Sequence, residues 1–182
     1  MAVTAGPAVA VGAAVEQFCG RGAEIKWVND IMLDGKKLCG ILTEGALSAE
    51  TGLFEYLVIG IGVNVASAGF PEELREVAAS MFGDVENPPR AAVAAAILNL
   101  LYDKLKMLPQ RTFMEEYRAR SCVIGKEIIM TDFAAGGAKS MARALDVDDD
   151  GGLIVETPDG VRKLHSGEVS VRVIPSEGAG QP

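Results

Sequence analysis

The first apolar segment of the chain is rich in alanine and shows no alternation between apolar and polar positions. Pro7 suits the first turn of a helix and Gly20 suits the residue just after one, so the pattern predicts a helix from about Pro7 to about Phe18. Because this helix is apolar nearly all round, we expect other parts of the protein to cover it on several sides. No Lys or Arg precedes the run, which argues against a signal peptide, and its Gly and Pro residues argue against a membrane span.

The next segments are short apolar runs separated by turn residues, as strands joined by turns are. Asn29-Asp30 has turn chemistry, and Asp34-Gly35 is a strong hairpin signal. The expected strands are residues 23–28, 31–33, 37–44 and 55–65.

Proline-containing segments introduce two further helices. Pro71 and the acidic residues after it predict a helix start over residues 71–74, and the segment from Asn87 to Arg90 is expected to cap a longer helix. Another helix is expected from about residue 113 to residue 120. The apolar positions of the longer helix are Val93, Ile97, Leu98, Leu101 and Leu105.

From Lys126 onward the pattern contains only short strands separated by Gly-containing turns. Each strand is too short and too polar to fold alone, which predicts a small barrel or sandwich. We therefore place a domain boundary near Ile124, with a first domain over 1–124, a small β domain over 125–175 and a flexible tail over 176–182. The expected strands of the small domain are 127–131, 140–147, 153–157 and 169–174.

The composition narrows the classes of function. Of 182 residues, 49% are hydrophobic and 23% are charged, which is typical of a packed globular protein. The formal net charge of −8, without a Lys/Arg-rich stripe, disfavours nucleic-acid binding because phosphate backbones would be repelled. Cys19, Cys39 and Cys122 are widely spaced and odd in number, which favours reduced thiols in a cytoplasmic protein over disulfides or a zinc site. His165 is the sole histidine of the sequence, which excludes a His-rich metal site and strongly disfavours a Ser/His/Asp triad.

Three short clusters hold the candidate chemistry, at residues 26–30, 37–42 and 60–64. Each alone has a plain structural interpretation: a turn, a solvated lysine at a strand start, and a tight packing site or bulge. The third cluster begins like a dinucleotide-binding GxGxxG motif, but neither the third glycine nor a following helix is present, which excludes that fold.

Taken together, the clusters predict a ligand site. The hairpin would bring Asp30 and Lys37 close to each other at one end of the sheet. Gly60 and Gly62 lie on one face of their strand and would let a ligand approach the backbone, since no Cβ stands in the way. The amide of Asn64 can both donate and accept, which suits the edge of a purine.

The ordered succession of these clusters resembles the biotin protein ligases. K-W-V-N-D at 26–30 is similar to that family's K-W-P-N-D, K-L-C-G-I-L at 37–42 to its K-L-x-G-I-L, and G-I-G-V-N at 60–64 to its G-x-G-x-N. G-E-V-S-V-R at 167–172 is similar to the G-E-[IV]-S-[LV]-R strand of the family's SH3-like C-terminal domain. Any one block is weak, but four blocks in order, with suitable spacing, are specific.

The resemblance implies an α/β fold of the α+β type. We expect a mixed sheet with the helices of a biotin ligase/lipoyl transferase-like catalytic domain, N-terminally truncated, followed by a small SH3-like β-barrel. Val28 stands where the family has proline. No segment matches the family's upstream biotin loop, G-R-G-R-x-G-R, and the helix-turn-helix of its bifunctional members is also absent.

The implied function is ATP-dependent activation of biotin to biotinyl-5′-AMP and transfer of biotin to a lysine of the biotin carrier domain of a carboxylase. ATP and biotin are then the substrates, with Mg²⁺ expected on the triphosphate and no dedicated metal site. A separate chain that supplies the upstream segment, and a homodimer, are further partners to consider. We expect neither nucleic acid nor a membrane as a partner.

The resemblance also implies roles for single residues. The Lys37 ammonium would stabilise the reacting anions, and Asp30 would orient the incoming carrier lysine or hold the adenylate. Asn29 would shape the turn, and Asn64 would contact the adenine. The remaining implied contacts are the adenylate slot, lined by Gly40, Gly60 and Gly62, and a contact from the C-terminal domain through Arg172.

Two other classes of function stay open. The chain could be a non-catalytic remnant that kept the fold and lost biotin capture, or an interaction module whose SH3-like barrel binds a protein partner. Ligand binding separates these from a ligase, because a remnant should bind neither ATP nor biotinyl-adenylate.

Overall fold

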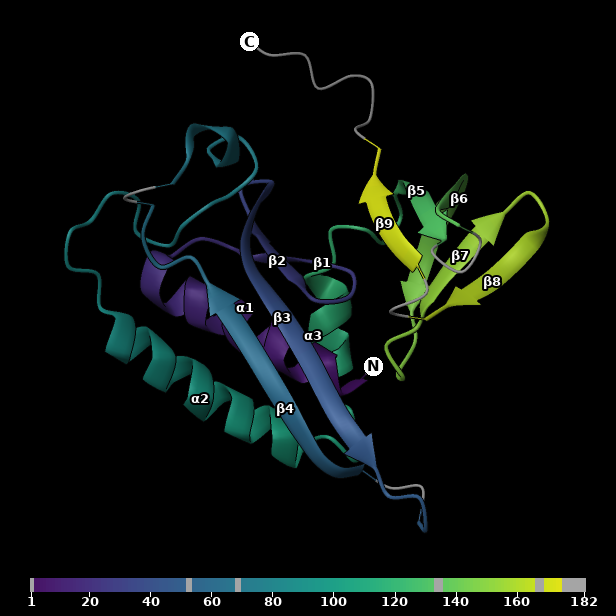
Figure 1. The fold of residues 1–182 in the computed structure, drawn as a ribbon, viewed down its shortest axis with the longest axis horizontal. Helices are drawn as coiled ribbons and strands as arrows, with labels where there is room; N and C mark the ends of the chain where they lie inside the picture. Colours follow the sequence, from purple (N-terminus) through teal and green to yellow (C-terminus); the bar gives the residue numbers. More distant parts are fainter. Residues whose placement is uncertain (1, 52–53, 68–69, 133–135, 166–168, 175–182) are drawn as a thin grey trace.

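The computed structural model describes residues 2–51, 54–67, 70–132, 136–165 and 169–174, and contains two antiparallel sheets with three α-helices beside the first (Figure 1). Helices α1 and α2 lie behind one face of the first sheet, and its other face is open. This arrangement confirms the α+β fold class. The helices are α1 (Ala2–Cys19), α2 (Arg90–Lys106) and α3 (Phe113–Ala119), and the first sheet has the order β1 (Glu24–Lys26), β2 (Asp30–Leu33), β3 (Lys36–Leu47), β4 (Phe54–Val63).

The expectation of a mixed sheet was wrong for the described strands. All ladders between β1, β2, β3 and β4 are antiparallel. The physical reason is that each strand follows the previous one through a short connection, which can join only antiparallel neighbours. Parallel pairing is limited to isolated bridges, such as Lys37 with Ala78.

The hairpin between β2 and β3 forms as predicted. Asp34 has φ 51° and Gly35 has φ 75°, so both central residues of the turn lie in the left-handed region. Two successive positive φ values are the signature of a type I′ turn, whose twist matches the flanking strands. This turn fixes the register of β3, and therefore the position of Lys37.

Helix α1 begins earlier than predicted. It starts at Ala2, so Pro7 lies inside the helix and not in its first turn. Proline lacks the N–H that would bond to the carbonyl of Val3, so one helical hydrogen bond is lost at that point. Burial of the small residues Ala5 and Ala8 compensates for that loss. Gly20 has φ 63° and ends the helix as predicted.

Helix α1 is covered within this chain, as its apolar sequence predicted. It packs on α2, α3 and the first sheet, and most of its side chains are buried. By length and composition α1 could cross a membrane, but 61% of that apolar window is buried inside the protein.

An ion-pair cluster joins α1 to the end of α3. The guanidinium of Arg120 contacts both carboxylate oxygens of Glu16, at 2.6 and 2.9 Å, and also Glu116 at 2.9 and 3.1 Å. The hydrogen bonds from Arg120 lower the pKa of Glu16. Burial alone would raise the pKa of Glu116, but hydrogen bonds from Lys104 and Arg120 outweigh burial and lower it.

Arg120→Ala is expected to lower the free energy of unfolding by about 1–3 kcal/mol near pH 7, toward the lower end because Glu16 is 44% exposed on its side chain. The lowered carboxylate pKa values stabilise the fold above the ordinary value of 4.5, and this contribution is lost as the pH falls through the lower folded values. Denaturant unfolding should therefore show a smaller difference in the free energy of unfolding between Arg120→Ala and the wild type at pH 3 than at pH 7. Arg21→Ala, which removes an exposed pair with Asp34, is the control.

The helical segments of the second half differ from their predictions in detail. Residues 71–74 form only a single 3₁₀ turn, η1 (Glu72–Leu74). Helix α2 begins after Pro89 without a side-chain cap, because two prolines hold Asn87 away from the first turn. Leu98 and Leu105 belong to the predicted apolar positions of α2, yet both are exposed. Leu98 lines a groove between α2 and β4.

The second sheet has the order β8-β7-β6-β5-β9 and includes one strand that was not predicted. The unpredicted strand is β8, whose sequence Gly-Val-Arg-Lys-Leu is too short and too charged to show alternation. The apolar cluster at the centre of the protein includes residues of both sheets, so the small β domain is packed on the rest of the chain. The strands are β5 (Glu127–Asp132), β6 (Ala138–Val147), β7 (Leu153–Thr157), β8 (Gly160–Leu164) and β9 (Val169–Val173).

Candidate functional site

A row of four residues crosses the open face of the first sheet. Lys26 pairs in register with Asp30, Asp30 with Gly40, and Gly40 with Gly62. Residues that pair directly across antiparallel strands point to the same face. One lysine, one aspartate and two glycines therefore share the face that the helices leave free.

A β-bulge adds Lys37 to the same face. Three positions separate Lys37 from Gly40, so in a regular strand the two residues would point to opposite faces. The register between β2 and β3 shifts between Ile31 and Met32, which inserts one extra residue in β3 and restores the common face. The side chains of Leu38 and Cys39 are consequently both buried.

Lys37 and Asp30 form an ion pair, as the hairpin predicted. The Lys37 Nζ lies 2.6 Å from the Asp30 Oδ1, and the two side chains are 49% and 21% exposed. The pair lies directly over Gly40, where a Cβ would meet the Lys37 Nζ at 3.4 Å. An ammonium and a carboxylate therefore stand at the rim of a floor that carries no side chains.

Asn29 forms two hydrogen bonds with β3 at the turn before Asp30. Its side-chain Nδ2 donates to the carbonyl of Ile41 at 2.6 Å, and the Ile41 amide donates back to the Asn29 carbonyl at 3.0 Å. The Tyr117 hydroxyl donates to the carbonyl of Val28 at 3.0 Å. These bonds fix the backbone from which the Asp30 side chain projects.

The segment after η1 forms one wall of the site and was not predicted to do so. Lys37 donates its amide to the Val77 carbonyl at 2.8 Å, and Ala79 donates to the Lys37 carbonyl at 2.8 Å. Asn64 lies at the end of β4 and donates its side-chain amide to the Lys37 carbonyl at 3.5 Å. A cavity of about 220 Å³ results, lined by Lys37, Gly40, Gly62, Asn64, Leu74, Val77 and Ala78, among others.

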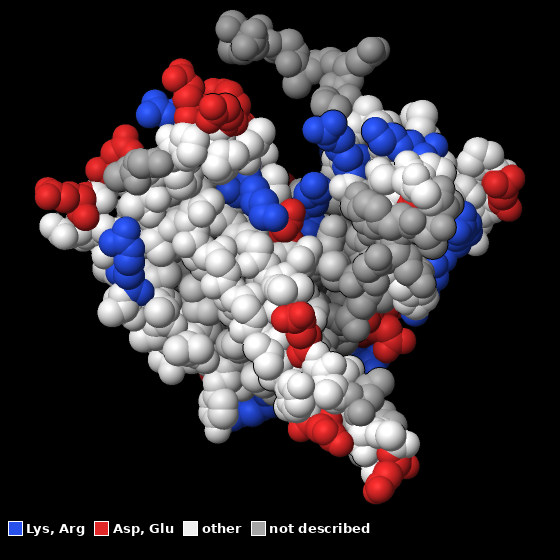
Figure 2. Space-filling view, in the orientation of Figure 1, with Lys and Arg blue, Asp and Glu red and all other residues white. Residues whose placement is uncertain are grey.

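The open face beyond the glycines is apolar. Gly60 pairs with Leu42, and Val58 and Tyr56 follow at alternate positions of β4 on the same face. The side chains of Leu42, Val58 and Tyr56 are each more than half exposed. Figure 2 shows the surface over β3 and β4 as mostly uncharged, with a small group of charged side chains near the hollow toward the small β domain. The site thus joins a charged end to a long apolar face.

The thiol of Cys39 lies beneath the site without taking part in its chemistry. Burial raises the pKa of Cys39 to about 12, with the Asp30 carboxylate adding to the shift and Lys37 opposing it. The thiol therefore stays protonated at neutral pH and is a poor nucleophile. Among the described residues, no group of three or more His, Cys, Asp or Glu side chains is placed to hold a metal ion.

Comparison with known proteins identifies the family. Residues 8–64 match the Biotin/lipoate A/B protein ligase family, and residues 123–172 match the Biotin protein ligase C terminal domain. The biotin--[acetyl-CoA-carboxylase] ligase of Paracoccus denitrificans is 31% identical over 174 residues, which cover 89% of this chain and 69% of that protein. The chain belongs to the biotin protein ligase family.

Other biotin protein ligases extend the comparison. The bifunctional ligase/repressor BirA of Bacillus spizizenii is 34% identical over 173 residues, which cover 90% of this chain and 51% of that protein. The biotin protein ligase from Aquifex aeolicus, solved in complex with biotin and ATP, is 25% identical, with a TM-score of 0.77 over 96% of this chain and 72% of that chain. The chain therefore spans about half the length of the Bacillus relatives and most of the Aquifex ligase fold.

Arg172 is the predicted site residue that lies on the second sheet, on β9. It lies exposed on β9 and pairs in register with Ile129. Within the described part of the chain it forms no ion pair. The turn at 166–168 and the tail at 176–182, which were also predicted, lie outside the described residues. The role of Arg172 toward the nucleotide of a biotin protein ligase remains a prediction.

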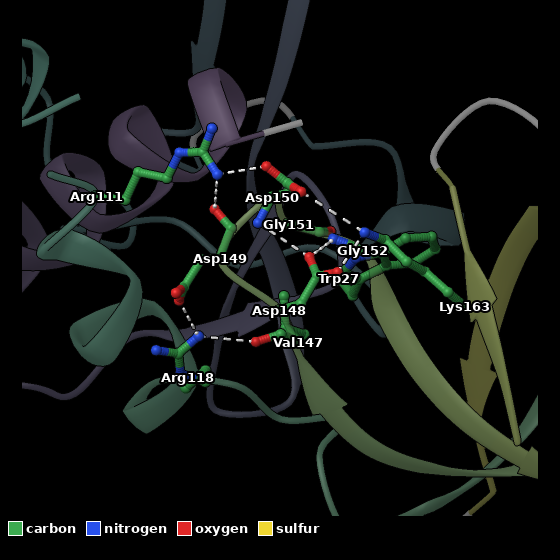
Figure 3. A network of polar contacts seen from close by, with 10 residues as sticks. All are labelled: Trp27, Arg111, Arg118, Val147, Asp148, Asp149, Asp150, Gly151, Gly152 and Lys163. Atoms are coloured by element: carbon green, nitrogen blue, oxygen red, sulfur yellow. Dashed lines mark hydrogen bonds and ion pairs between the residues drawn. The ribbon is translucent and has the colours of Figure 1, made fainter. Parts of the chain in front are cut away.

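The residue that sequence reasoning missed is Trp27. Its indole Nε1 donates to the carbonyl of Gly151, in the small β domain, at 2.9 Å, and its side chain is buried (Figure 3). Its place in the K-W-x-N-D motif of biotin protein ligases marked it as notable, but the partner lies 124 residues away. Nothing in the local sequence predicts a contact over that separation.

Proposed function

We propose that this chain performs the central part of the biotin protein ligase reaction. Biotin is activated by ATP to biotinyl-5′-AMP, and the biotinyl group is then transferred to a lysine of a biotin carrier domain. Family membership supports this proposal, as does the Aquifex ligase, which was solved with biotin and ATP. The observation that carries it is the Lys37–Asp30 pair at the rim of the floor formed by Gly40 and Gly62.

The first half-reaction brings two anions together. A carboxylate oxygen of biotin attacks the α-phosphorus of ATP, the bond to the β-phosphate oxygen breaks, and pyrophosphate leaves with the electron pair. A fixed cation lowers the barrier, because negative charge gathers where the two anions meet. The Lys37 ammonium is half-exposed at the site rim and can serve this purpose, at about 1–4 kcal/mol for one contact at about 4 Å.

The second half-reaction needs an amine to be held beside the mixed anhydride. The neutral lysine amine attacks the biotinyl carbonyl carbon, the bond from that carbon to the phosphate oxygen breaks, AMP leaves with the electron pair, and the proton lost from the amine passes to water. Lys37 contacts only one oxygen of Asp30, which leaves the second oxygen for the incoming ammonium. Asn64 lines the same cavity, where its amide can contact the adenine edge.

The glycine floor explains how an adenylate could lie on the sheet. A Cβ at Gly62 would meet the Gly40 carbonyl at 3.7 Å, so the chain itself leaves room there for a small side chain. The space above Gly60 and Gly62 is therefore free for a flat ligand, beside the ion pair that lies over Gly40. The apolar face beyond them suits the less polar part of the adenylate. Mg²⁺ would accompany the triphosphate as part of the substrate.

The remaining elements of the proposal concern partners and location. A carboxylase carrier domain would supply the acceptor lysine, and the reaction would take place in the cytoplasm. The Gly/Arg-rich biotin loop of the family would come from another polypeptide segment. An apolar groove of about 350 Å³ between β4 and α2 supports such a docking, since a strand added to β4 would place alternate side chains in it. A homodimer would use the same edge of β4 and would therefore compete with the added strand.

The test is a titration of the chain with a non-hydrolysable analogue of biotinyl-adenylate. We expect saturable binding, and a loss of at least about 10-fold in affinity for Gly62→Val, because the branched side chain fills the slot. Gly22→Val is the matched control, since Gly22 is exposed and a Cβ there meets nothing closer than 4.0 Å. Equal affinity in Gly62→Val and wild type, or an absence of binding, would contradict the proposal.

A further inference from the structure

The turn that carries Asp30 is held by three side-chain hydrogen bonds, two of which reach outside its own sheet. Asn29 ties it to β3, and Tyr117 ties it to α3 through the carbonyl of Val28. The third tie is the bond from the Trp27 Nε1 to the Gly151 carbonyl at 2.9 Å. Trp27 is 6% exposed, so the loss of this bond would leave a buried carbonyl without its donor. Of the three ties, this one comes from the small β domain.

The loop that provides the Gly151 carbonyl is ordered by its own backbone. The Asp148 carboxylate accepts from the amides of Asp150 at 3.0 Å and Gly152 at 2.8 Å. The Asp148 amide donates to the Gly152 carbonyl at 2.9 Å. This arrangement closes residues 148–152 into a tight turn, and it points the Gly151 carbonyl at the Trp27 indole (Figure 3).

Three cations from three different elements then hold the aspartates of this loop. Lys163 of β8 pairs with Asp148, and Arg111, from the connection between α2 and α3, pairs with Asp150. Arg118 of α3 contacts Asp149 at 3.0 Å and the Val147 carbonyl at 2.9 Å. The loop is therefore fixed on one side to its own sheet and on the other to the helices that pack beside the first sheet.

We propose that Trp27 is a positioning residue, through which the 148–152 loop of the small β domain sets the orientation of Asp30. The inference rests on the proposed function, because Asp30 acts on the adenylate and on the acceptor lysine. The Trp27 side chain is buried, and its indole N–H is taken by the Gly151 carbonyl. Only Val28 and Asn29 separate Trp27 from Asp30 along the chain, so a shift of the loop would move the Asp30 carboxylate.

Charge and burial decide which contact carries this coupling. The Asp149 and Asp150 side chains are 69% and 62% exposed, so each ion pair alone is weak and screened by salt. The indole bond is buried and cannot be replaced by water without opening the contact. The ion pairs thus hold the loop as a group, and the indole bond is the single point at which the loop acts on the turn.

The experiment measures the turn and the ligand site separately in the whole chain. The Ile41 amide donates to the Asn29 carbonyl at 3.0 Å, so its hydrogen-exchange rate reports the docking of the turn. The Ala144 amide, bonded to the Lys126 carbonyl at 2.9 Å, reports the small β domain. Trp27→Phe removes the N–H and keeps an aromatic ring. We expect about 10-fold faster exchange at Ile41, unchanged exchange at Ala144, and about 10-fold weaker binding of the biotinyl-adenylate analogue.

A second variant tests the same coupling in case Trp27→Phe does not fold. Asp149→Asn changes one exposed carboxylate, and should accelerate exchange at Ile41 by about two- to fivefold because one of the four ion pairs of the loop is lost. Asp103→Asn, which removes an exposed ion pair with Lys106 within α2, is the control and should change neither amide.

The outcomes separate the coupling from the function. Equal acceleration at Ile41 and Ala144 in both variants would show general destabilisation and overturn the inference, as would unchanged exchange at Ile41. If the wild-type chain binds no adenylate analogue, the proposed function fails, while the exchange rates still decide whether the loop holds the turn.

Discussion

Replacement of Lys37 by alanine in a complete ligase, with the biotin-loop segment present, is expected to slow biotinyl-adenylate formation by about 10²–10³-fold. The ammonium lies 2.6 Å from Asp30, at the rim of the glycine floor. Its removal takes away the cation that offsets the approaching anions, and it leaves the Asp30 carboxylate without this partner to repel them. The measurement is pyrophosphate release in single-turnover conditions.

The neighbouring lysine provides a matched control. The Lys36 Nζ contacts the Arg75 carbonyl at 2.7 Å and Glu76 at 3.7 Å, away from Asp30. Lys36→Ala should therefore release pyrophosphate at a near wild-type rate. Both variants should unfold near the wild-type temperature, because each lysine side chain is well exposed. If Lys37→Ala releases pyrophosphate as fast as Lys36→Ala, Lys37 has no role in adenylate formation.

The sequence was informative where a local pattern determined the geometry. The Asp34-Gly35 turn fixed the hairpin, and the hairpin alone required its two arms, with Asp30 and Lys37, to lie side by side. The bulge that places Lys37 on the same face as Gly40 was not predicted, because an extra residue in one strand leaves no mark on apolar alternation. The prediction of the ion pair was thus confirmed, but it rested on the hairpin alone and did not include the bulge.

The contacts that the sequence could not predict are those between distant segments. The wall formed by Val77 and Ala78 comes from an irregular segment, and its only ties to Lys37 that the structure describes are backbone bonds, which any sequence can form. Leu98 has the spacing of a core residue, yet it is exposed, since no described segment of this chain covers the edge beside β4. Periodicity identifies an apolar stripe but not the element that packs on it.

The chain alone is expected to transfer little or no biotin. The adenylate would lie on an open sheet face, since the described side chains around Gly60 and Gly62 form a floor and one wall and leave the side toward the solvent free. A closing loop would exclude water, which strengthens the contact with Lys37 and protects the mixed anhydride from hydrolysis. Without that closure, most of any adenylate formed should be hydrolysed before a carrier lysine arrives.

The same open edge should make the chain self-associate. Within the described residues β4 pairs only with β3, and Phe54, Tyr56 and Val58 are exposed along it, next to the apolar groove against α2. Long apolar edge strands pair readily with other strands. Sedimentation should therefore show a concentration-dependent rise in mass, reduced by Val58→Lys, which places a charge on the edge.

One experiment tests the requirement for closure directly. The purified chain is incubated with ATP, labelled biotin and a carrier domain, alone and with a peptide that contains the Gly/Arg-rich biotin loop and its flanking strand. We expect labelling to rise at least about 100-fold with the peptide, since closure supplies both charge and exclusion of water. The mass of the complex should fall to that of one chain plus one peptide, because the added strand occupies the β4 edge. Efficient labelling by the chain alone would show that the residues on β2, β3 and β4 suffice, and that biotin is held by a site other than the one assigned to the absent loop.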